Sequence, residues 1–439
     1  MAYVTPWNQE GYTLAEAYRG RLYSVSPVWY TITPSGDDVT KYSVLGGPPR
    51  SSDAEWYLRL SQPAVDKGTG RTLPPVKILP RFRFEGWQAQ DYKTLLSAAI
   101  EGIALTENIM MEVMTRKYDG VVIETGAMWA LREPIKVLAD RLHGEGKQIV
   151  VVMPALRNEA ITSETDALIK SGVKDLAPFV DKIQIMTYDY TGSQGTYFDP
   201  STMTLPADSI LRTDGIRLPG PNTPFSYLRN NMEAFLGSSK AQAAFSDPLG
   251  QFGVFDDLGE AAYNDTDRVP ADKLMMGVAM YGYTYPLAHV LASGNTQAVS
   301  PPTSPTAAKD NSTEEQEKYR LRADQREAVH ALDAARILAA VGDPVTIREI
   351  REVFTAGKAL VRKDASSGEA YFDYLKLKED GSVHTREDGS TAPVAWYRRA
   401  YWPTPTTIKE RIEVVEEHGV KSVALWDIGQ GGAWLLHSL

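Results

Sequence analysis

Four carboxylates that follow apolar runs are the side chains of this 439-residue chain most able to do chemistry. Glu85, Glu124, Asp189 and Asp427 each come at or just after the end of a short apolar or β-branched run. A carboxylic acid can donate a proton in a reaction when burial or a neighbouring carboxylate raises its pKa. If the protein is a catalyst, Glu124 and Asp189 are the candidate catalytic residues.

Aromatic side chains lie beside these carboxylates or end further apolar runs. Tyr188 precedes Asp189, and Trp426, Tyr281 and Trp29 each stand at the end of an apolar segment. Tyrosine and tryptophan combine a broad apolar face with a hydrogen-bonding group, which suits them to binding. The candidate ligand-binding residues are Glu124, Tyr188, Asp189, Trp426, Tyr281, Glu85 and Trp29.

A purely structural role is the alternative for each of these candidates. Glu124 in this interpretation is a buried carboxylate that is hydrogen-bonded to its neighbours. Asp119 is expected to tie down the start of its strand, and Trp7 and Trp87 are expected to be core aromatic residues.

Eight short apolar runs alternate with helical patterns, which is typical of repeated βα units. Eight such units predict a closed (β/α)8 barrel, an α/β fold in which the C-terminal ends of the strands carry the site. The expected strands are Ala2–Pro6, Leu22–Trp29, Val76–Phe84, Gly120–Thr125, Gln148–Pro154, Lys182–Thr187, Leu274–Tyr281 and Ser422–Asp427.

Helical periodicity is clearest over Asp91–Lys117, where a stripe that includes Ile103 and Met114 is expected to be buried. A shorter helix is expected over Thr406–His418, with Thr407 and Glu410 as its capping box.

Two long insertions interrupt the repeated pattern, at about 191–272 and about 284–403. The expected organisation is a barrel domain from residues 1–283 and 404–439, with an inserted α+β lobe at 284–403. Within the lobe we expect a flexible Ser/Thr/Pro/Ala segment near 292–311 and a charged helix over Ser312–Val341. Two strands are expected to follow, over Ala370–Lys378 and Val394–Trp402.

The segment DGVVIETG at residues 119–126 resembles a known motif. Glycoside hydrolase family 18, the chitinase family, carries D-G-x-D-x-D-x-E on its fourth barrel strand. Asp119 and Gly120 match this motif, whereas Val122 and Glu124 replace its second and third aspartates. Gly126 stands where the family has its catalytic glutamate.

Three further segments are similar to strands of the same family. MTYD at residues 186–189 resembles the end of the sixth strand, which implies that Tyr188 and Asp189 contact the acetamido group of a sugar. MGVAMYG at residues 276–282 is similar to the seventh strand. ALWD at residues 424–427 resembles the eighth strand, which implies that Trp426 is the floor beneath the sugar.

One chitinase-like branch of the family is similar over more of the chain, at residues 3–8, 26–29, 80–87, 219–224 and 426–431. That branch also lacks the terminal glutamate of the motif. The resemblance therefore implies a saccharide-binding protein without ordinary chitinase activity.

The position of Glu124 argues in the same direction. Residues 122, 124 and 126 share one face of the strand, so Glu124 lies about 7 Å below the expected acid at roughly 3.3 Å per residue. A proton donor must approach its acceptor to within about 3 Å. We therefore do not expect conventional acid catalysis from this strand.

Two other functions remain open. The first is a retaining glycoside hydrolase that acts on N-acetylhexosamine-containing glycans with a relocated acid, at Glu124, Glu85 or Asp189. The second is a protein-binding scaffold, with a protein receptor as its partner and a vestigial sugar cleft.

Composition excludes several classes of protein. The net charge of −10 argues against a nucleic-acid partner, and the chain has no cysteine for disulfides or thiolate metal sites. The sequence has no apolar run long enough to span a membrane and no spacing typical of a metal site or a nucleotide cofactor.

Two glycosylation sequons, at Asn264 and Asn311, are compatible with secretion. We expect a location outside the cell or in an endomembrane or lysosome-like lumen, with a signal peptide that is absent from this sequence. The expected partner is a chitin-type or other amino-sugar oligosaccharide.

Overall fold

A computed structural model describes residues 1–34, 42–66, 68–97, 99–157, 163–198, 216–237, 268–290, 296–298, 337–339, 342–355, 361–375 and 397–437. The chain divides into two compact units. The first unit consists of Met1–Tyr188, Phe225–Met280 and Thr404–Leu439, and the second consists of Asp189–Pro224 and Tyr281–Pro403.

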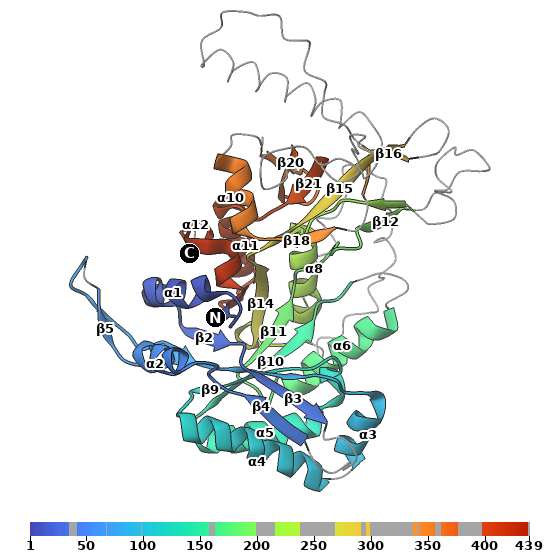
Figure 1. The fold of residues 1–439 in the computed structure, drawn as a ribbon. Helices are drawn as coiled ribbons and strands as arrows, with labels where there is room; N and C mark the ends of the chain where they lie inside the picture. The colour runs from blue at the N-terminus through green and yellow to red at the C-terminus, as the bar shows by residue number, and fades with distance from the viewer. Residues whose placement is uncertain are drawn as a thin grey trace, which may run out of the picture. The chain divides into compact units, whose positions relative to one another are not determined.

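Parallel strands form a ring in the first unit (Figure 1). Each strand pairs in parallel with the next, and the last strand pairs with the first. In ring order they are β1 (Ala2–Val4), β2 (Ser24–Pro27), β7 (Lys77–Ile78) with β8 (Arg81–Phe84), β9 (Gly120–Glu124), β10 (Gln148–Pro154), β11 (Lys182–Met186), β14 (Leu274–Ala279) and β22 (Val423–Trp426). All eight expected strands are present, and the predicted (β/α)8 barrel is confirmed.

β7 and β8 are two halves of one barrel strand. The Leu79 amide between them donates to the Val25 carbonyl of β2 at 2.9 Å. The Pro80 carbonyl accepts from the Val122 amide of β9, also at 2.9 Å. This strand therefore joins both of its neighbours and closes the ring.

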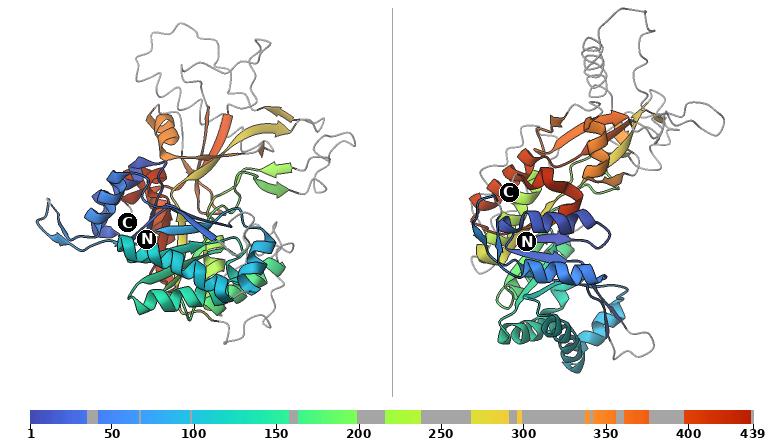
Figure 2. Two further views of the ribbon diagram at one scale, coloured as in Figure 1. Left: turned by 60° about the horizontal axis from the view of Figure 1, so that its bottom comes forward. Right: turned by 60° about the vertical axis from the view of Figure 1, so that its left-hand side comes forward.

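Helices lie outside the ring (Figures 1 and 2). α4 packs beside α5, and α1 packs against α12. The helices of the first unit are α1 (Gln9–Ala17), α2 (Ser51–Leu60), α3 (Ala89–Ser97), α4 (Ala99–Arg116), α5 (Arg132–Gly144), α6 (Ser163–Leu176), α8 (Phe225–Leu236), α11 (Pro405–Glu417) and α12 (Ile428–Leu436), with 3-10 turns at Arg19–Arg21, Met128–Ala130 and Ala271–Lys273. Two hairpins extend the unit, β3 (Tyr30–Pro34) with β4 (Tyr42–Gly46), and β5 (Ala64–Val65) with β6 (Thr72–Leu73).

The helix expected over Asp91–Lys117 is two helices, α3 and α4. Ile103 and Met114 were expected on the buried stripe but are exposed, whereas Leu105 and Ile109 are buried. The buried face of α4 is formed by Leu105, Ile109, Met110 and Val113, and Ile103 and Met114 lie beside that face although they are equally apolar.

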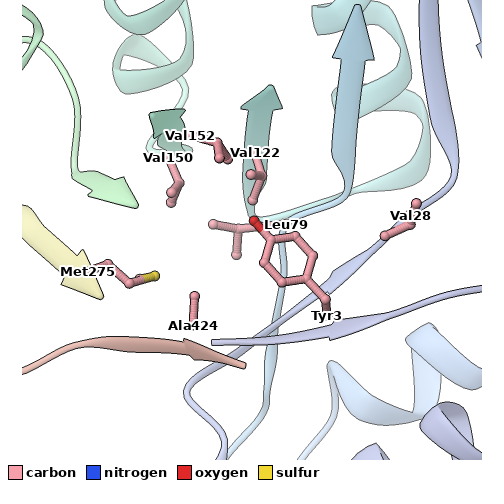
Figure 3. Packing of buried hydrophobic residues seen from close by; sticks show 8 residues of the cluster. All are labelled: Tyr3, Val28, Leu79, Val122, Val150, Val152, Met275 and Ala424. Atoms are coloured by element: carbon pink, nitrogen blue, oxygen red, sulfur yellow. The ribbon is translucent and has the colours of Figure 1, made fainter. Parts of the chain in front are cut away.

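Side chains fill the inside of the ring, as in other barrels of this size. Figure 3 shows eight of them converging from different strands and from the ends of strands. They are Tyr3, Val28, Leu79, Val122, Val150, Val152, Met275 and Ala424, with Met1, Met186 and Trp426 packed against them. At the start of β9, Asp119 accepts a hydrogen bond from the Ile78 amide at 2.8 Å, which confirms its expected role in tying down the strand.

The second unit contains an antiparallel sheet. The strands expected over Ala370–Lys378 and Val394–Trp402 are β20 and β21, which pair with each other. The elements of this unit are β12 (Thr196–Phe198), β13 (Ile216–Leu218), β15 (Gly282–Val290), β16 (Thr296–Ala298), β17 (Ile337–Ala339), β18 (Asp343–Val345), α10 (Ile347–Thr355), β19 (Arg362–Lys363), β20 (Ala370–Leu375) and β21 (Tyr397–Tyr401).

Several expectations for the inserted lobe concern residues outside those described. Of the segment near 292–311, only β16 is described. The helix expected over Ser312–Val341 also lies outside the described residues, except at Ile337–Ala339, which form a strand against β15 and not a helix. In the part of the chain that is described, no helix is both long enough and apolar enough to cross a membrane.

Candidate functional site

Glu124 ends β9 with its carboxylate between two arginines. Arg81 Nη1 donates to Glu124 Oε2 at 2.9 Å, and Arg83 Nε lies 3.5 Å from Glu124 Oε1. The two arginines and Glu124 share one face because β8 and β9 pair with Arg83 opposite Glu124 and because side chains alternate along a strand. Each carboxylate oxygen of Glu124 therefore faces a guanidinium group.

Arg81 is a buried cation at this end of the barrel. Its side chain is 7% exposed, and its guanidinium carbon lies over the Trp426 ring, 5.1 Å from the ring centroid. A guanidinium is attracted to the negative face of an indole ring. Arg81 therefore ties the end of β9 to the end of β22.

Glu85 and Arg83 form the exposed side of the same group. Arg83 Nη1 lies 3.4 Å from Glu85 Oε1, and both side chains are about half exposed, at 48% and 47%. Arg81, Glu124, Arg83 and Glu85 thus form a chain of alternating charges that runs from the barrel interior to the solvent. We call these four residues the charged row.

Sequence reasoning missed both arginines of the charged row. The available signal was the pattern Arg81-Phe82-Arg83-Phe84, which places two cations on one face of a barrel strand. A buried cation requires a partner, and a carboxylate on the adjacent strand is the natural one.

Open space surrounds the position where the resemblance expects an acid. A Cβ atom added to Gly126 would meet nothing within 4 Å. The neighbouring Thr125 hydroxyl forms a hydrogen bond with the Tyr92 hydroxyl at 2.6 Å. The chain therefore has room for a side chain at position 126 but supplies none.

Trp426 is held from the barrel interior as well as by Arg81. The Tyr3 ring approaches it edge-on, with the centroids 4.9 Å apart and the planes at 64°. The Tyr3 hydroxyl donates to the Gln184 side chain, and burial raises the pKa of Tyr3 well above its ordinary value. Tyr3 therefore acts as a neutral hydrogen-bond donor.

Tyr188 lies buried at the end of β11, against β14. A Cβ atom on Gly277 would come within 2.7 Å of the Tyr188 ring. The Thr187 hydroxyl donates to the Gly277 carbonyl at 2.7 Å. The absence of a side chain at Gly277 therefore makes room for Tyr188.

The two tryptophans near the start of the chain differ in their surroundings. Trp29 is buried, its indole N–H donates to the Tyr12 hydroxyl at 2.8 Å, and its ring packs edge-on against Trp56 and Tyr57. Trp7, which was expected in the core, is 68% exposed after the end of β1. The structure thus places Trp29 in an aromatic cluster and leaves Trp7 accessible.

Asp427 is a helix cap. Its carboxylate accepts hydrogen bonds from the Gln430 amide of α12 at 3.0 Å and from the Thr5 hydroxyl at 3.3 Å. Burial raises the pKa of the Asp427 carboxyl to about 6, against the opposing effect of these hydrogen bonds. Its hydrogen bonds account for this carboxylate as a structural group.

A second group of candidates lies in the second unit. Asp189 Oδ1 accepts hydrogen bonds from the hydroxyls of Tyr281 and Tyr283, the latter at 2.8 Å. Asn222 links the two segments that carry these residues, because its Oδ1 accepts from the Asp189 amide at 2.7 Å and its Nδ2 donates to the Tyr281 carbonyl at 2.9 Å. The structure therefore brings Asp189 and Tyr281 together.

The backbone of Asp189 is strained. Its φ of 58° lies in the left-handed region, which residues other than glycine rarely adopt. Such strain is found more often at functional positions than elsewhere, since the surrounding structure must hold it in place. Asn222 supplies the hydrogen bond that does so.

No group of three or more His, Asp or Glu side chains among the described residues could hold a metal ion.

The fold and the charged row define a class of protein: a (β/α)8 barrel with ionisable and aromatic side chains at the C-terminal ends of its strands. A family model described as glycosyl hydrolases family 18 matches residues 70–431. The chain therefore belongs to glycosyl hydrolases family 18.

Solved structures of other proteins share this fold. A chitinase from Chromobacterium violaceum ATCC 12472 matches with a TM-score of 0.57 and 14% identity, covering 100% of this chain and 96% of that chain. A protein described as a class V chitininase from Pseudomonas fluorescens Pf-5 matches with a TM-score of 0.57 and 15% identity, covering 100% and 97%. The spore cortex-lytic enzyme SleL of Bacillus megaterium QM B1551 matches with a TM-score of 0.56 and 11% identity, covering 99% and 72%.

Proposed function

We propose that this protein binds oligosaccharides that contain N-acetylhexosamine at the C-terminal end of its barrel, and that it lacks the usual acid catalysis of its family. The proposal rests mainly on what the structure shows at positions 124 and 126. Gly126 has open space around it but no side chain that could act as an acid. The two carboxylate oxygens of Glu124 face Arg81 and Arg83. A general acid must instead present a proton to the leaving oxygen of the substrate.

The candidate contacts differ in their depth. Glu85, Arg83 and the exposed Trp7 are accessible in the first unit, whereas Tyr188 is buried and the Trp426 ring, expected as a contact from the sequence, is covered by Arg81. In the second unit, resemblance to the sixth and seventh strands of the family makes Asp189 and Tyr281 candidate contacts in their own right. The wider resemblance to the chitinase-like branch typified by chitinase domain-containing protein 1 supports binding without ordinary chitinase activity.

Titration calorimetry with N-acetylglucosamine oligomers of increasing length tests binding. We expect measurable heat that grows with oligomer length until the site is filled. If a diverse set of neutral and amino-sugar oligosaccharides produces no heat, binding is contradicted and a protein-binding scaffold becomes the better account.

Product analysis of the same mixtures tests the absence of hydrolysis. We expect no cleavage by the purified protein. Cleavage that disappears in Glu124→Gln, Glu85→Gln or Asp189→Asn would instead identify a retaining hydrolase with a relocated acid.

A further inference from the structure

Arg81 covers an aromatic face that a sugar would otherwise use. Trp426 ends β22 at the edge of the barrel where ligands of this fold bind. An indole ring there could stack on the apolar face of a sugar ring. Instead the Arg81 guanidinium lies over the ring, 5.1 Å from its centroid, and Tyr3 packs edge-on against it.

The guanidinium is fixed in this place. Arg81 is 7% exposed and donates to Glu124 at 2.9 Å. Separating a buried ion pair leaves uncompensated charge in a medium of low dielectric, which costs free energy. The interaction of a neutral sugar with Trp426 is too weak to offset that cost and displace the Arg81 guanidinium. The face of Trp426 beneath Arg81 is therefore covered by the guanidinium and not by a sugar.

The rest of the charged row lies closer to the solvent. Arg83 follows Arg81 by two residues on β8, which places its side chain about 7 Å closer to the C-terminal end of the barrel, and Glu85 comes directly after the strand ends at Phe84. Their side chains are about half exposed, at 48% and 47%, and Glu124 is 20% exposed. Guanidinium donors and carboxylate acceptors thus alternate on an accessible surface.

We propose that Arg81 closes the deepest position of the site, and that a bound oligosaccharide lies across the outer layer formed by Glu124, Arg83 and Glu85. This inference rests on the proposed sugar-binding function. Sugar hydroxyls both donate and accept hydrogen bonds, so they match a surface that offers both kinds of group. Because the row contains two cations and two anions, the fitting ligand is a neutral oligosaccharide and not an acidic one.

Two alanine variants test the proposal as a matched pair. Arg81→Ala and Arg83→Ala each remove one guanidinium from Glu124, but only Arg81 covers Trp426. For chitin oligomers we expect Arg81→Ala to bind about tenfold more tightly and Arg83→Ala about tenfold more weakly, each the equivalent of one good contact. A loss of affinity in both variants, or an unchanged affinity in Arg81→Ala, would overturn the proposal.

Trp426→Leu in the otherwise unchanged protein gives a second test that does not depend on the folding of Arg81→Ala. We expect its affinity to stay within about twofold of the parent, since the covered ring makes no sugar contact. A folded Trp426→Leu protein that loses binding while the parent binds would overturn this inference and leave the proposed function standing. If the parent binds no oligosaccharide but Arg81→Ala does, the closed position is supported and the proposed function is contradicted.

Discussion

Gly120, in β9, and Gly126, two residues after its end, differ in the space available for a side chain. A Cβ atom on Gly120 would lie 2.1 Å from the Gln148 carbonyl oxygen of β10, whereas a Cβ atom on Gly126 would meet nothing within 4 Å. We expect Gly120→Ala to lower the free energy of unfolding by about 1–3 kcal/mol through overpacking, and Gly126→Ala to change it by less than about 0.5 kcal/mol. Urea unfolding of both variants measures this. Equal losses would show that position 126 is sterically closed, and the missing acid would then have a packing explanation.

Asp427 predicts a specific pH dependence of stability. Its pKa of about 6 in the folded protein lies above the ordinary value of 3.8, so the fold favours the protonated form. The stabilisation is present in full below pH 3.8 and is lost as the pH rises through about 6. Relative to Asp427→Asn, whose amide oxygen can still accept from the Gln430 amide, the parent protein should lose about 3 kcal/mol between about pH 3 and pH 7, at 1.36 kcal/mol per pKa unit. Unfolding at a series of pH values measures the difference, and parallel stability curves would contradict it.

Among the site residues, the carboxylates and aromatics were predictable and the arginines were not. Glu124, Glu85 and Trp426 could be expected at strand ends because the strands themselves were clear from the sequence. The sequence could not place Arg81 over Trp426, because β8 and β22 are far apart in the sequence. Their side chains meet only inside the closed barrel. Trp29 and Trp7 show the same limit, since exposure depends on the neighbouring strands and not on the local pattern.

At the scale of elements, the cap of α11 carries a testable contribution. Sequence spacing predicted a capping box between Thr407 and Glu410, but the structure forms it one turn earlier. Thr404 is the N-cap, its hydroxyl accepts from the Thr407 amide at 3.2 Å, and the Thr407 hydroxyl accepts from the Thr404 amide at 2.8 Å. Pro405 at the first helical position explains the earlier start, since proline is favoured there.

Thr404→Ala should therefore lower the free energy of unfolding by about 1 kcal/mol. Thr406→Ala is the matched control, because Thr406 is exposed on the same helix and takes no part in the box. Urea unfolding compares the two. A loss in Thr406→Ala as large as that in Thr404→Ala would contradict the assigned cap.

The barrel strands were predictable because each is a short apolar run, and a parallel strand buried on both faces leaves that signature. The buried face of a helix was less predictable, as the exposed Ile103 and Met114 show, because apolar residues of α4 also stand beside its buried face. Strand position therefore follows from composition, whereas apolar composition alone does not fix which face of this helix is buried.

At the scale of the whole molecule, the net charge of −10 bears on the kind of ligand. A neutral oligosaccharide releases no counterions, so its affinity should change little between about 0.05 and 0.5 M NaCl, a range over which exposed charges become largely screened. A polyanionic glycan should show no binding in the same titrations. An affinity for chitin oligomers that falls steeply with salt would contradict binding of a neutral ligand.

The pairing of β1 with both β2 and β22 has a consequence for synthesis of the chain. During synthesis β1 lacks one of its neighbours until Val423–Trp426 has emerged from the ribosome, and β14 lacks the same partner. Between β14 and β22 lie about 140 residues, including most of the second unit. The nascent protein therefore carries two unpaired strand edges while these residues are translated, and a chain that terminates within that interval exposes both edges to aggregation.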